Sequence, residues 1–337
     1  MATIHDVARV AGVSISTVSY ALSGKRSVSL ETRRRIEDAV RELDYRPNAG
    51  ARMLAGRRTY ILAVTEPLRA DTYAPAHMAF VLAVTKAARK YDYDVLLLTQ
   101  EEAAGGLRRV TSSRLVDAIV VLDVLTEDER ADLVRTLDIP AVLVGVPADA
   151  HGLVCVDLDF EAVGAMAVDR LVDAGHTTIG LLGHHPSVYD GGSNFPPRLR
   201  DGFLARAAER GVVARFVMPE RDPGRVGSAV EALLGPDGDL TGLVMHCEER
   251  VQADALESLA ARGLRVPGDV SVVSAASTFD TTRFTPPLDT IPLVAGETCG
   301  RAVELALDQL SGAVAPRVEL VPPRYLHHGS VAPRPSS

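Results

Sequence analysis

The chain has 337 residues, of which 47% are hydrophobic and 24% are charged. This length suggests two or three domains, and this composition is typical of globular proteins rather than disordered or fibrous ones. No stretch approaches 18 consecutive apolar residues, and the charged N-terminus lacks a secretory apolar core, so we expect neither a membrane span nor export. Three widely spaced cysteines without a CxxC pair indicate reduced thiols in a cytoplasmic protein.

The net charge of −8 conceals a basic N-terminal segment. Residues 1–58 contain 11 Lys and Arg against 6 Asp and Glu, whereas the remainder contains 25 basic and 38 acidic residues. A basic head on an acidic body is the layout expected where one end of a protein meets a polyanion. On charge alone, chance clustering is an equally good explanation.

The first 46 residues predict three short helices. Thr3 and Asp6 fit a capping box at the start of the first helix, and Gly12 fits the left-handed turn that ends it. Ser14 and Ser29 are placed to cap the second and third helices, and the third helix turns three consecutive arginines outward. A helix, a glycine turn and a short second helix predict a helix-turn-helix, whose second helix enters the major groove of DNA.

The second helix supplies the candidate base-reading side chains, which project from its outer face: Ile15, Ser16 and Tyr20. Ser16 can hydrogen-bond to a base edge, whereas Ile15 or Tyr20 can pack on thymine methyl groups. Phosphate contacts position a protein without reading sequence, and the candidates for these contacts are Thr17, Ser19, Lys25 and Arg33. A small helical bundle with polar outer faces is the alternative interpretation.

The stretch TIHDVARVAGVSISTVSYALSGKRSVSLETRRRIEDAVRELDYRPNAGARMLAG, residues 3–56, resembles the headpiece of the LacI family of bacterial transcription regulators. Family members usually carry arginine after the TVS of the second helix, where this chain has Tyr20. A tyrosine makes no bidentate contact to guanine. The operator of this protein is therefore expected to differ from those of better-known members.

Residues 47–58 are predicted to be a hinge between the head and the body. A helix this short is marginal by itself in water. In the family, the equivalent segment folds on the operator, and a leucine inserts into the minor groove. By this resemblance Leu54 is the inserted residue, with Asn48 and Arg52 beside it. Packing of Leu54 against the following domain is the alternative.

From residue 59 onward, short apolar segments alternate with amphipathic segments of helical period. This alternation predicts an α/β fold with parallel sheets covered by helices on both faces. Two series of strands predict two doubly wound lobes, with a ligand cleft at the carboxyl ends of the strands. The predicted strands are Ile61–Val64, Val95–Leu98, Ala118–Leu122, Ala141–Val144, Ile179–Leu182, Val212–Met218, Leu243–Met245 and Val270–Val273.

The body, residues 59–337, also resembles the LacI family and, through it, periplasmic sugar-binding proteins of type I. The stretches LVDAIVVLD, IPAVLVG, LVDAGHTTIGLLG, RLRDGF, GLRVPGDVSVVS and TPPLDTI carry this resemblance. It implies that the chain crosses between the lobes three times. The expected first lobe comprises about residues 59–157 and 286–316, and the expected second lobe comprises about residues 158–285 and 317–330.

Polar side chains at predicted strand ends and in adjacent loops are the candidates for effector binding: Tyr73, His77, Asp123, Arg198, Arg200 and Glu248. Carboxylates and an arginine beside an aromatic ring suit a polyhydroxylated ligand, because they make charge-assisted hydrogen bonds to hydroxyls. The resemblance implies one ligand-binding arginine just before DGF, and both Arg198 and Arg200 remain candidates for it. Each residue could instead be a solvated charge or a helix cap. Gly145 and Ala276 stand where the family often has acids, so the exact ligand is not inferred.

No P-loop, GxGxxG, GxSxG or HExxH motif is present. The adjacent pairs His184–His185 and His327–His328 are poorly placed to chelate, because neighbours on a strand point to opposite faces. We therefore expect no catalytic residue, cofactor or metal. The prediction is a homodimeric repressor of carbohydrate-utilisation genes that binds palindromic double-stranded operator DNA and is released by a sugar. The alternatives are a corepressor-dependent regulator that binds a purine or sugar phosphate, a sugar-transport component, and a sugar-modifying enzyme.

Overall fold

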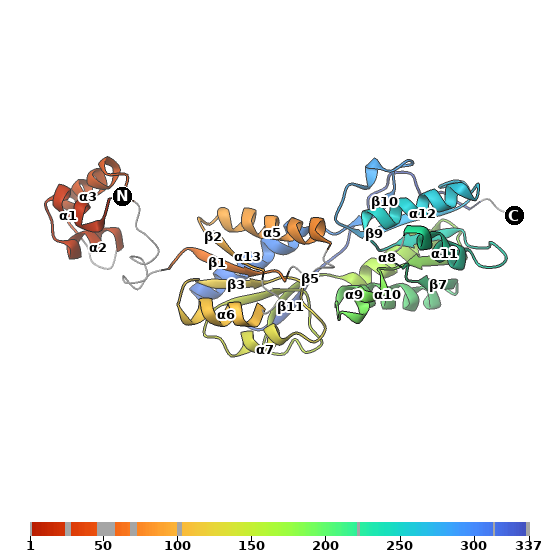
Figure 1. The fold of residues 1–337 in the computed structure, drawn as a ribbon, viewed down its shortest axis with the longest axis horizontal. Helices are drawn as coiled ribbons and strands as arrows, with labels where there is room; N and C mark the ends of the chain where they lie inside the picture. Colours follow the sequence, from red (N-terminus) through yellow and green to blue (C-terminus); the bar gives the residue numbers. More distant parts are fainter. Residues whose placement is uncertain are drawn as a thin grey trace.

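The computed structural model describes the chain in seven segments, which are residues 2–23, 28–45, 58–67, 73–99, 103–220, 223–312 and 314–334. They form a small helical head and two α/β lobes (Figure 1). No helix in these segments is long and apolar enough to span a membrane.

The head comprises α1 (Ile4–Ala11), α2 (Ile15–Ser23) and α3 (Leu30–Glu42). The predicted caps are present. Thr3 and Asp6 form a reciprocal capping box, Gly12 ends α1 at φ 63°, and the Ser29 hydroxyl accepts a hydrogen bond from the Thr32 amide at 3.2 Å. The inward faces of the helices bury a small shared core that includes Val7, Ala11, Val18, Ile36 and Ala39. This core holds α2 against the other two helices and leaves its outer face exposed.

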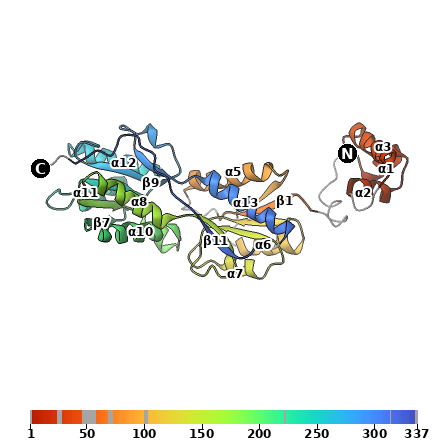
Figure 2. The same cartoon turned by 180° about the vertical axis from the view of Figure 1, so that it is seen from behind.

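The first lobe contains a six-stranded parallel sheet in the order β11-β5-β4-β3-β1-β2. Alternate strand residues point to opposite faces, so each face has its own core. Helices α5 and α13 cover one face, whereas α6 and α7 cover the other. Figure 2 shows α5 and α13 from the reverse side. The elements are β1 (Ile61–Thr65), α5 (Ala74–Arg89), β2 (Asp94–Leu98), α6 (Ala103–Ser112), β3 (Ala118–Val121), α7 (Glu129–Arg135), β4 (Ala141–Val144), β5 (Val154–Leu158), α13 (Ala295–Ser311) and β11 (Arg317–Val321).

The second lobe contains a five-stranded parallel sheet in the order β10-β9-β8-β6-β7. Helices α8 and α10 pack on one face, and α11 and α12 pack on the other. The elements are α8 (Phe160–Asp173), β6 (Thr178–Leu182), α9 (Pro186–Asp190), α10 (Phe195–Glu209), β7 (Val213–Val217), α11 (Pro223–Leu234), β8 (Gly242–Met245), α12 (Glu249–Ala261), β9 (Ser271–Ser277), the 3₁₀ turn η1 (Thr281–Arg283) and β10 (Asp289–Pro292).

Two glycines allow α8 and α10 to pack closely. A Cβ atom added to Gly202 would lie 2.2 Å from the Glu161 carbonyl oxygen, and one added to Gly164 would lie 2.3 Å from the Leu199 carbonyl oxygen. Any side chain at these positions would push the helices apart. The glycine of the DGF motif is therefore a packing residue, and it keeps the N-terminus of α10 close to the end of β5.

The predicted lobe boundaries are wrong at two places. The range 286–316, assigned to the first lobe, contains β10, which pairs with β9 in the second sheet. The range 317–330, assigned to the second lobe, contains β11, which pairs with β5 in the first sheet. Both are edge strands, so only one neighbour defines them, and their short or polar sequences give little periodic signal. The chain passes between the lobes after β5, after β10 and after β11, which agrees with three crossings.

Candidate functional site

The outer face of α2 presents the three predicted base-reading residues. Ile15 is 41% exposed and Tyr20 is 38% exposed, and Ser16 is also exposed. The Ser16 and Thr17 hydroxyl oxygens lie 2.8 and 2.7 Å from the Ser14 hydroxyl oxygen, so one hydroxyl cluster begins the helix. This mixture of polar and apolar groups on an exposed helix suits readout in a major groove.

The predicted phosphate contacts are placed only in part. Thr17 and Ser19 are half-buried on α2, and Arg33 is exposed on α3. Lys25 and the predicted hinge residues Asn48, Arg52 and Leu54 lie outside the described residues, so their predicted roles stay predictions.

A cavity of about 330 Å³ lies between the two lobes, at the carboxyl ends of their strands. This is the size of a small-molecule site and the position predicted for ligands of doubly wound sheets. Of the predicted effector residues, four line the cavity: Tyr73, His77, Asp123 and Glu248. The further polar and aromatic lining residues include Glu66, Phe80, Asp157, Phe160, His184, Asn194, Phe195, His246 and Phe279.

The two candidate arginines do not line the cavity. Arg198 lies behind its wall, where it donates to Asp157 Oδ2 at 2.5 Å and has its guanidinium 5.4 Å from the centre of the Phe160 ring. Arg200 faces elsewhere, toward Asp201 and the Tyr189 ring. The prediction of a ligand-binding arginine is therefore not supported by this geometry, because the buried Asp157 already occupies the Arg198 side chain.

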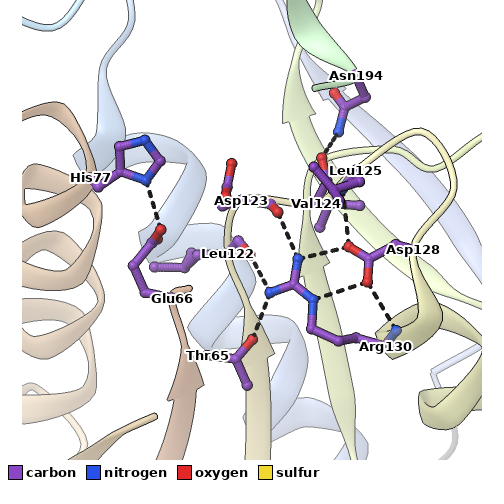
Figure 3. Close-up of polar contacts among 10 residues, drawn as sticks. All are labelled: Thr65, Glu66, His77, Leu122, Asp123, Val124, Leu125, Asp128, Arg130 and Asn194. Atoms are coloured by element: carbon purple, nitrogen blue, oxygen red, sulfur yellow. Dashed lines mark hydrogen bonds and ion pairs between the residues drawn. The ribbon is translucent and has the colours of Figure 1, made fainter. Parts of the chain in front are cut away.

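The wall in the first lobe carries a cluster of ionisable groups (Figure 3). Glu66 follows β1, Asp123 follows β3, and His77 lies in the first turn of α5. His77 Nδ1 lies 2.7 Å from Glu66 Oε1, and one ligand atom from each of the three residues falls within 4.8 Å of the others. Glu66 is only 1% exposed. Burial raises the pKa of its carboxyl group, and the hydrogen bond from His77 opposes this rise.

A buried ion pair fixes the ends of the strands behind this cluster. Arg130 and Asp128, whose side chains are 3% and 2% exposed, form a two-point contact. The remaining Arg130 donors reach the Thr65 hydroxyl at 3.1 Å and the carbonyls of Leu122 and Asp123 at 2.9 and 2.6 Å. All five guanidinium N–H groups are thus used (Figure 3). This network joins the end of β1 to the turn after β3, which carries Asp123 in a left-handed conformation at φ 48°.

The wall in the second lobe combines stacked rings with the Glu248 carboxylate at the N-cap of α12. The His184 and His246 ring centres are 4.6 Å apart in an edge-to-face arrangement, and Phe195 packs against both rings. Burial lowers the pKa of His184 to about 4, and burial together with the neighbouring His184 lowers the pKa of His246 well below its usual value. Both imidazoles are therefore neutral near pH 7. This wall offers aromatic faces and uncharged nitrogen atoms to a ligand.

The two walls touch each other beside the cavity. The Asn194 side-chain amide donates to the carbonyl of Val124, and the Thr126 amide donates to the Gly192 carbonyl at 2.8 Å. Gly145 explains why no acid stands after β4, because a Cβ atom there would lie 2.7 Å from the Val124 Cβ atom, with φ at 126°. The turns after β3 and β4 of the first lobe thus lie too close together for a side chain at this position, and Asn194 of the second lobe adds a contact at 3.1 Å.

Sequence reasoning missed several lining residues for identifiable reasons. Asp157 belongs to β5, a strand that was not predicted. Glu66 lies two residues after the predicted strand Ile61–Val64 and directly after the observed β1, and this position near a strand end is the available signal. His184 was considered only as a chelating pair with its neighbour, whereas His185 instead caps α9 by accepting the Ser187 amide hydrogen bond at 3.1 Å. In the sequence, the phenylalanines of the lining cannot be distinguished from ordinary core residues.

Comparisons with known proteins decide the family. Residues 3–48 match the model of the bacterial regulatory proteins of the lacI family, and residues 168–331 match a periplasmic binding protein-like domain. The regulator GalS of Salmonella typhimurium is 32% identical over 330 residues, which cover 93% of this chain and 92% of that protein. The protein belongs to the LacI family. It is a DNA-binding transcription regulator with a ligand-binding domain, and not an enzyme.

Further relatives agree with this family membership. The repressor PurR of Pasteurella multocida is 27% identical over 323 residues, which cover 92% of each chain. Among solved structures, the Lac repressor dimer bound to operator has a TM-score of 0.77 at 23% identity and covers 98% of this chain and 99% of that chain. The CelR–cellobiose complex has a TM-score of 0.66 at 22% identity, with 98% and 100% covered. At these identities, the structural likeness establishes the shared fold of this LacI-family chain.

Proposed function

We propose that this protein is a homodimeric repressor that binds a palindromic operator and is released when a neutral sugar enters the cavity. The observation that carries the choice of ligand is the charge of the cavity. Glu66, Asp123, Asp157 and Glu248 line it, whereas no Lys or Arg occurs among the described residues of its lining. Carboxylates accept hydrogen bonds from hydroxyls and repel phosphate.

The same observation separates the two leading candidates. A sugar phosphate or a nucleotide would place a negative charge beside Glu66, Asp123 and Glu248, and beside Asp157, whose charge Arg198 balances. The corepressor alternative is therefore disfavoured for these ligands. An uncharged purine could pack against the aromatic wall formed by His184 and Phe195, and it stays as the second candidate. A sugar ring suits both walls of the cavity, because its apolar face can pack on the aromatic rings and its hydroxyls can donate to the carboxylates.

Two structural features would couple the ligand to DNA. A sugar that contacts both walls changes the relative stability of the lobe arrangements, and it acts only through its different affinity for them. The chain emerging from the head is tied to the first lobe, where the Asp117 carboxylate accepts hydrogen bonds from the Thr59 and Tyr60 amides at 2.7 and 2.8 Å. A shift of that lobe would therefore reach the segment that leads to the head.

Homodimerisation would give the operator its symmetry. One helix-turn-helix reads a half-site, so a two-fold dimer requires a palindrome. The solved Lac repressor dimer of the same fold is bound to operator, which supports this arrangement. We place the protein in the cytoplasm, where bacterial operator DNA lies.

A thermal-shift screen tests the ligand. Neutral mono- and disaccharides, the matching sugar phosphates, and purine bases are each added to the full chain. A ligand that binds only the native state stabilises it, by about 2.7 kcal/mol when the ligand concentration is 100 times its Kd, and therefore raises the melting temperature. We expect a neutral sugar to raise it and its phosphate to have little effect. A rise with the phosphate alone would contradict the proposal.

Operator binding is tested with the head variants. Tyr20→Ala should weaken operator affinity by about 5- to 150-fold, because loss of a base contact costs about 1–3 kcal/mol. The matched control is Tyr91→Ala, which removes a tyrosine of similar exposure from the first lobe. The chain of residues 59–337 should lose operator binding and its steep salt dependence. Leu54→Ala should weaken operator binding and leave ligand binding unchanged.

A further inference from the structure

The Glu66 carboxylate is buried with only half of its hydrogen-bonding capacity used. Its Oε1 atom lies 2.7 Å from His77 Nδ1, whereas Oε2 has no hydrogen-bond partner in the described part of the chain. A buried carboxylate oxygen without a partner is costly, and it calls for a cation or a strong donor in the working state of the protein. Because Glu66 lines the cavity, this partner can enter from the cavity.

The neighbours of Glu66 complete a set of three possible ligands. His77 comes from α5 and Asp123 comes from the turn after β3, which is the strand beside β1. Their ligand atoms and that of Glu66 lie within 4.8 Å of one another. Opposite ligands of one ion stand about 4.2 Å apart when each metal–ligand distance is about 2.1 Å. Small side-chain rotations would therefore bring the three atoms onto a single ion.

The buried Arg130 makes the position of these ligands rigid without competing for them. Its five N–H groups are used by Asp128, by the Thr65 hydroxyl and by two backbone carbonyls, so it donates no hydrogen bond to the Glu66 or Asp123 carboxylates. It instead holds the backbone at the ends of β1 and β3, as outer-shell groups do around metal ligands (Figure 3).

We propose that Glu66, His77 and Asp123 bind a divalent transition-metal ion of the zinc or manganese type in the wall of the effector cavity. One imidazole nitrogen with two carboxylate oxygens favours such an ion over Ca²⁺ or Mg²⁺, which prefer oxygen ligands alone. A protonated amine would be served by the carboxylates alone, whereas a neutral imidazole nitrogen is a common ligand of transition-metal ions. The cavity side of the ion stays open to further ligands.

The open side gives the ion a role in effector recognition. Neighbouring hydroxyls of a sugar in the cavity would complete its coordination sphere, so the ion would join the effector to the first lobe. This role rests on the proposed function, whereas metal binding itself does not. No pattern in the sequence predicts the site, because its three residues are spread over residues 66 to 123 and match no chelating motif.

Metal binding is tested on the full chain without an affinity tag. Mn²⁺ is titrated and the free ion is followed by electron paramagnetic resonance, with Zn²⁺ added afterwards as a competitor. We expect one Mn²⁺ ion per chain, displaced by Zn²⁺. Glu66→Gln and His77→Gln should each weaken Mn²⁺ binding by at least about tenfold, the loss that even an outer-shell partner can cause.

The control is His327→Gln, which disrupts a similar histidine–carboxylate pair outside the cavity. His327 Nδ1 lies 2.8 Å from Asp289 Oδ2, and neither residue lines the cavity. This variant should bind Mn²⁺ like the unchanged protein. Circular dichroism checks that each variant is folded. If Glu66→Gln does not fold, the His77→Gln variant still tests the site, because the His77 side chain is only half-buried.

Two results would overturn the proposal: no saturable Mn²⁺ or Zn²⁺ binding at concentrations on the order of 1 mM, or equal binding by the folded His77→Gln variant. Operator binding with a chelator present, and the sugar screen run both with a chelator and with added Mn²⁺, separate this outcome from failure of the proposed function. A chain that binds operator but neither ion contradicts only the metal site. A chain that binds the ion but no sugar contradicts the proposed effector and leaves the metal site standing.

Discussion

The two walls of the cavity differ in chemistry, although the two lobes share one architecture and Glu248 adds a carboxylate to the second wall. In the first lobe, the strand ends carry carboxylates held in place by the buried Arg130–Asp128 pair. In the second lobe, the equivalent strand ends carry the neutral imidazoles of His184 and His246 among phenylalanine rings. A parallel sheet delivers whatever residue follows each strand to the same edge. The fold therefore fixes where a site lies, and the residues after the strands decide what it binds.

The largest expected effect tests whether the first wall depends on its buried ion pair. Arg130→Met leaves Asp128 as an unpaired buried charge, so it should lower the free energy of unfolding by about 3–5 kcal/mol. The control is Arg135→Met on the same helix, whose partner Asp132 is 82% exposed and which should cost about 1 kcal/mol or less. Urea denaturation measures both. Equal losses would show that the buried Arg130–Asp128 ion pair contributes no more to stability than an exposed ion pair does.

The neutral histidines of the second wall should make the stability of the protein depend on pH. The folded-state pKa values of His184 and His246 lie below the ordinary value, so the unfolded chain binds more protons at mildly acidic pH. Their contribution to stability is present above about pH 6.5 and is lost as the pH falls toward 4. The melting temperature should therefore fall between pH 7.5 and pH 5.

Variants assign this pH dependence to the buried rings. His246→Gln should reduce the fall in melting temperature by roughly 3 °C, which is the shift that about 1 kcal/mol gives in a lobe of this size. His151→Gln removes an exposed histidine and should leave the fall unchanged. If both variants keep the full pH dependence, the stacked histidines are not its source.

The last predicted effect concerns the contact between the walls. Asn194→Ala removes the hydrogen bond to the Val124 carbonyl and should cost about 1–2 kcal/mol. Gln309→Ala is the matched control, since Gln309 donates its side-chain amide to the Ala141 carbonyl at 3.2 Å within the first lobe. Small-angle scattering should show a larger radius of gyration for Asn194→Ala alone. An unchanged radius would mean that other contacts hold the lobes together.

The helices of the head were predictable from the sequence because their caps depend on neighbouring residues. Thr3, Asp6 and Ser29 act on amides within three residues, and Gly12 supplies a left-handed turn by itself, so neighbouring residues determine each cap. The predicted strands were placed to within a few residues for the same reason, because each is a short apolar run. The missed strands β5, β10 and β11 depend on their neighbours in the sheet, and this information is not local.

The cavity was only half predictable. Tyr73, His77, Asp123 and Glu248 stand beside predicted strand or helix ends, and all four line it. Arg198 has the right position in the chain, but its side chain is taken by Asp157, a residue on an unpredicted strand. No pattern along the chain reveals that a side chain has already been paired by a distant carboxylate.

The sequence by itself determined a helix-turn-helix head, two parallel-sheet lobes and a ligand site at the strand ends, because capping, hydrophobic period and strand polarity are written in adjacent residues. Only the tertiary structure decided which side chains meet there. Glu66, His77 and Asp123 come together because β1 and β3 are neighbours in the sheet and α5 packs over it. Burial then left one oxygen of Glu66 without a hydrogen-bond partner among the described residues, and desolvation of that kind depends on packing from every side.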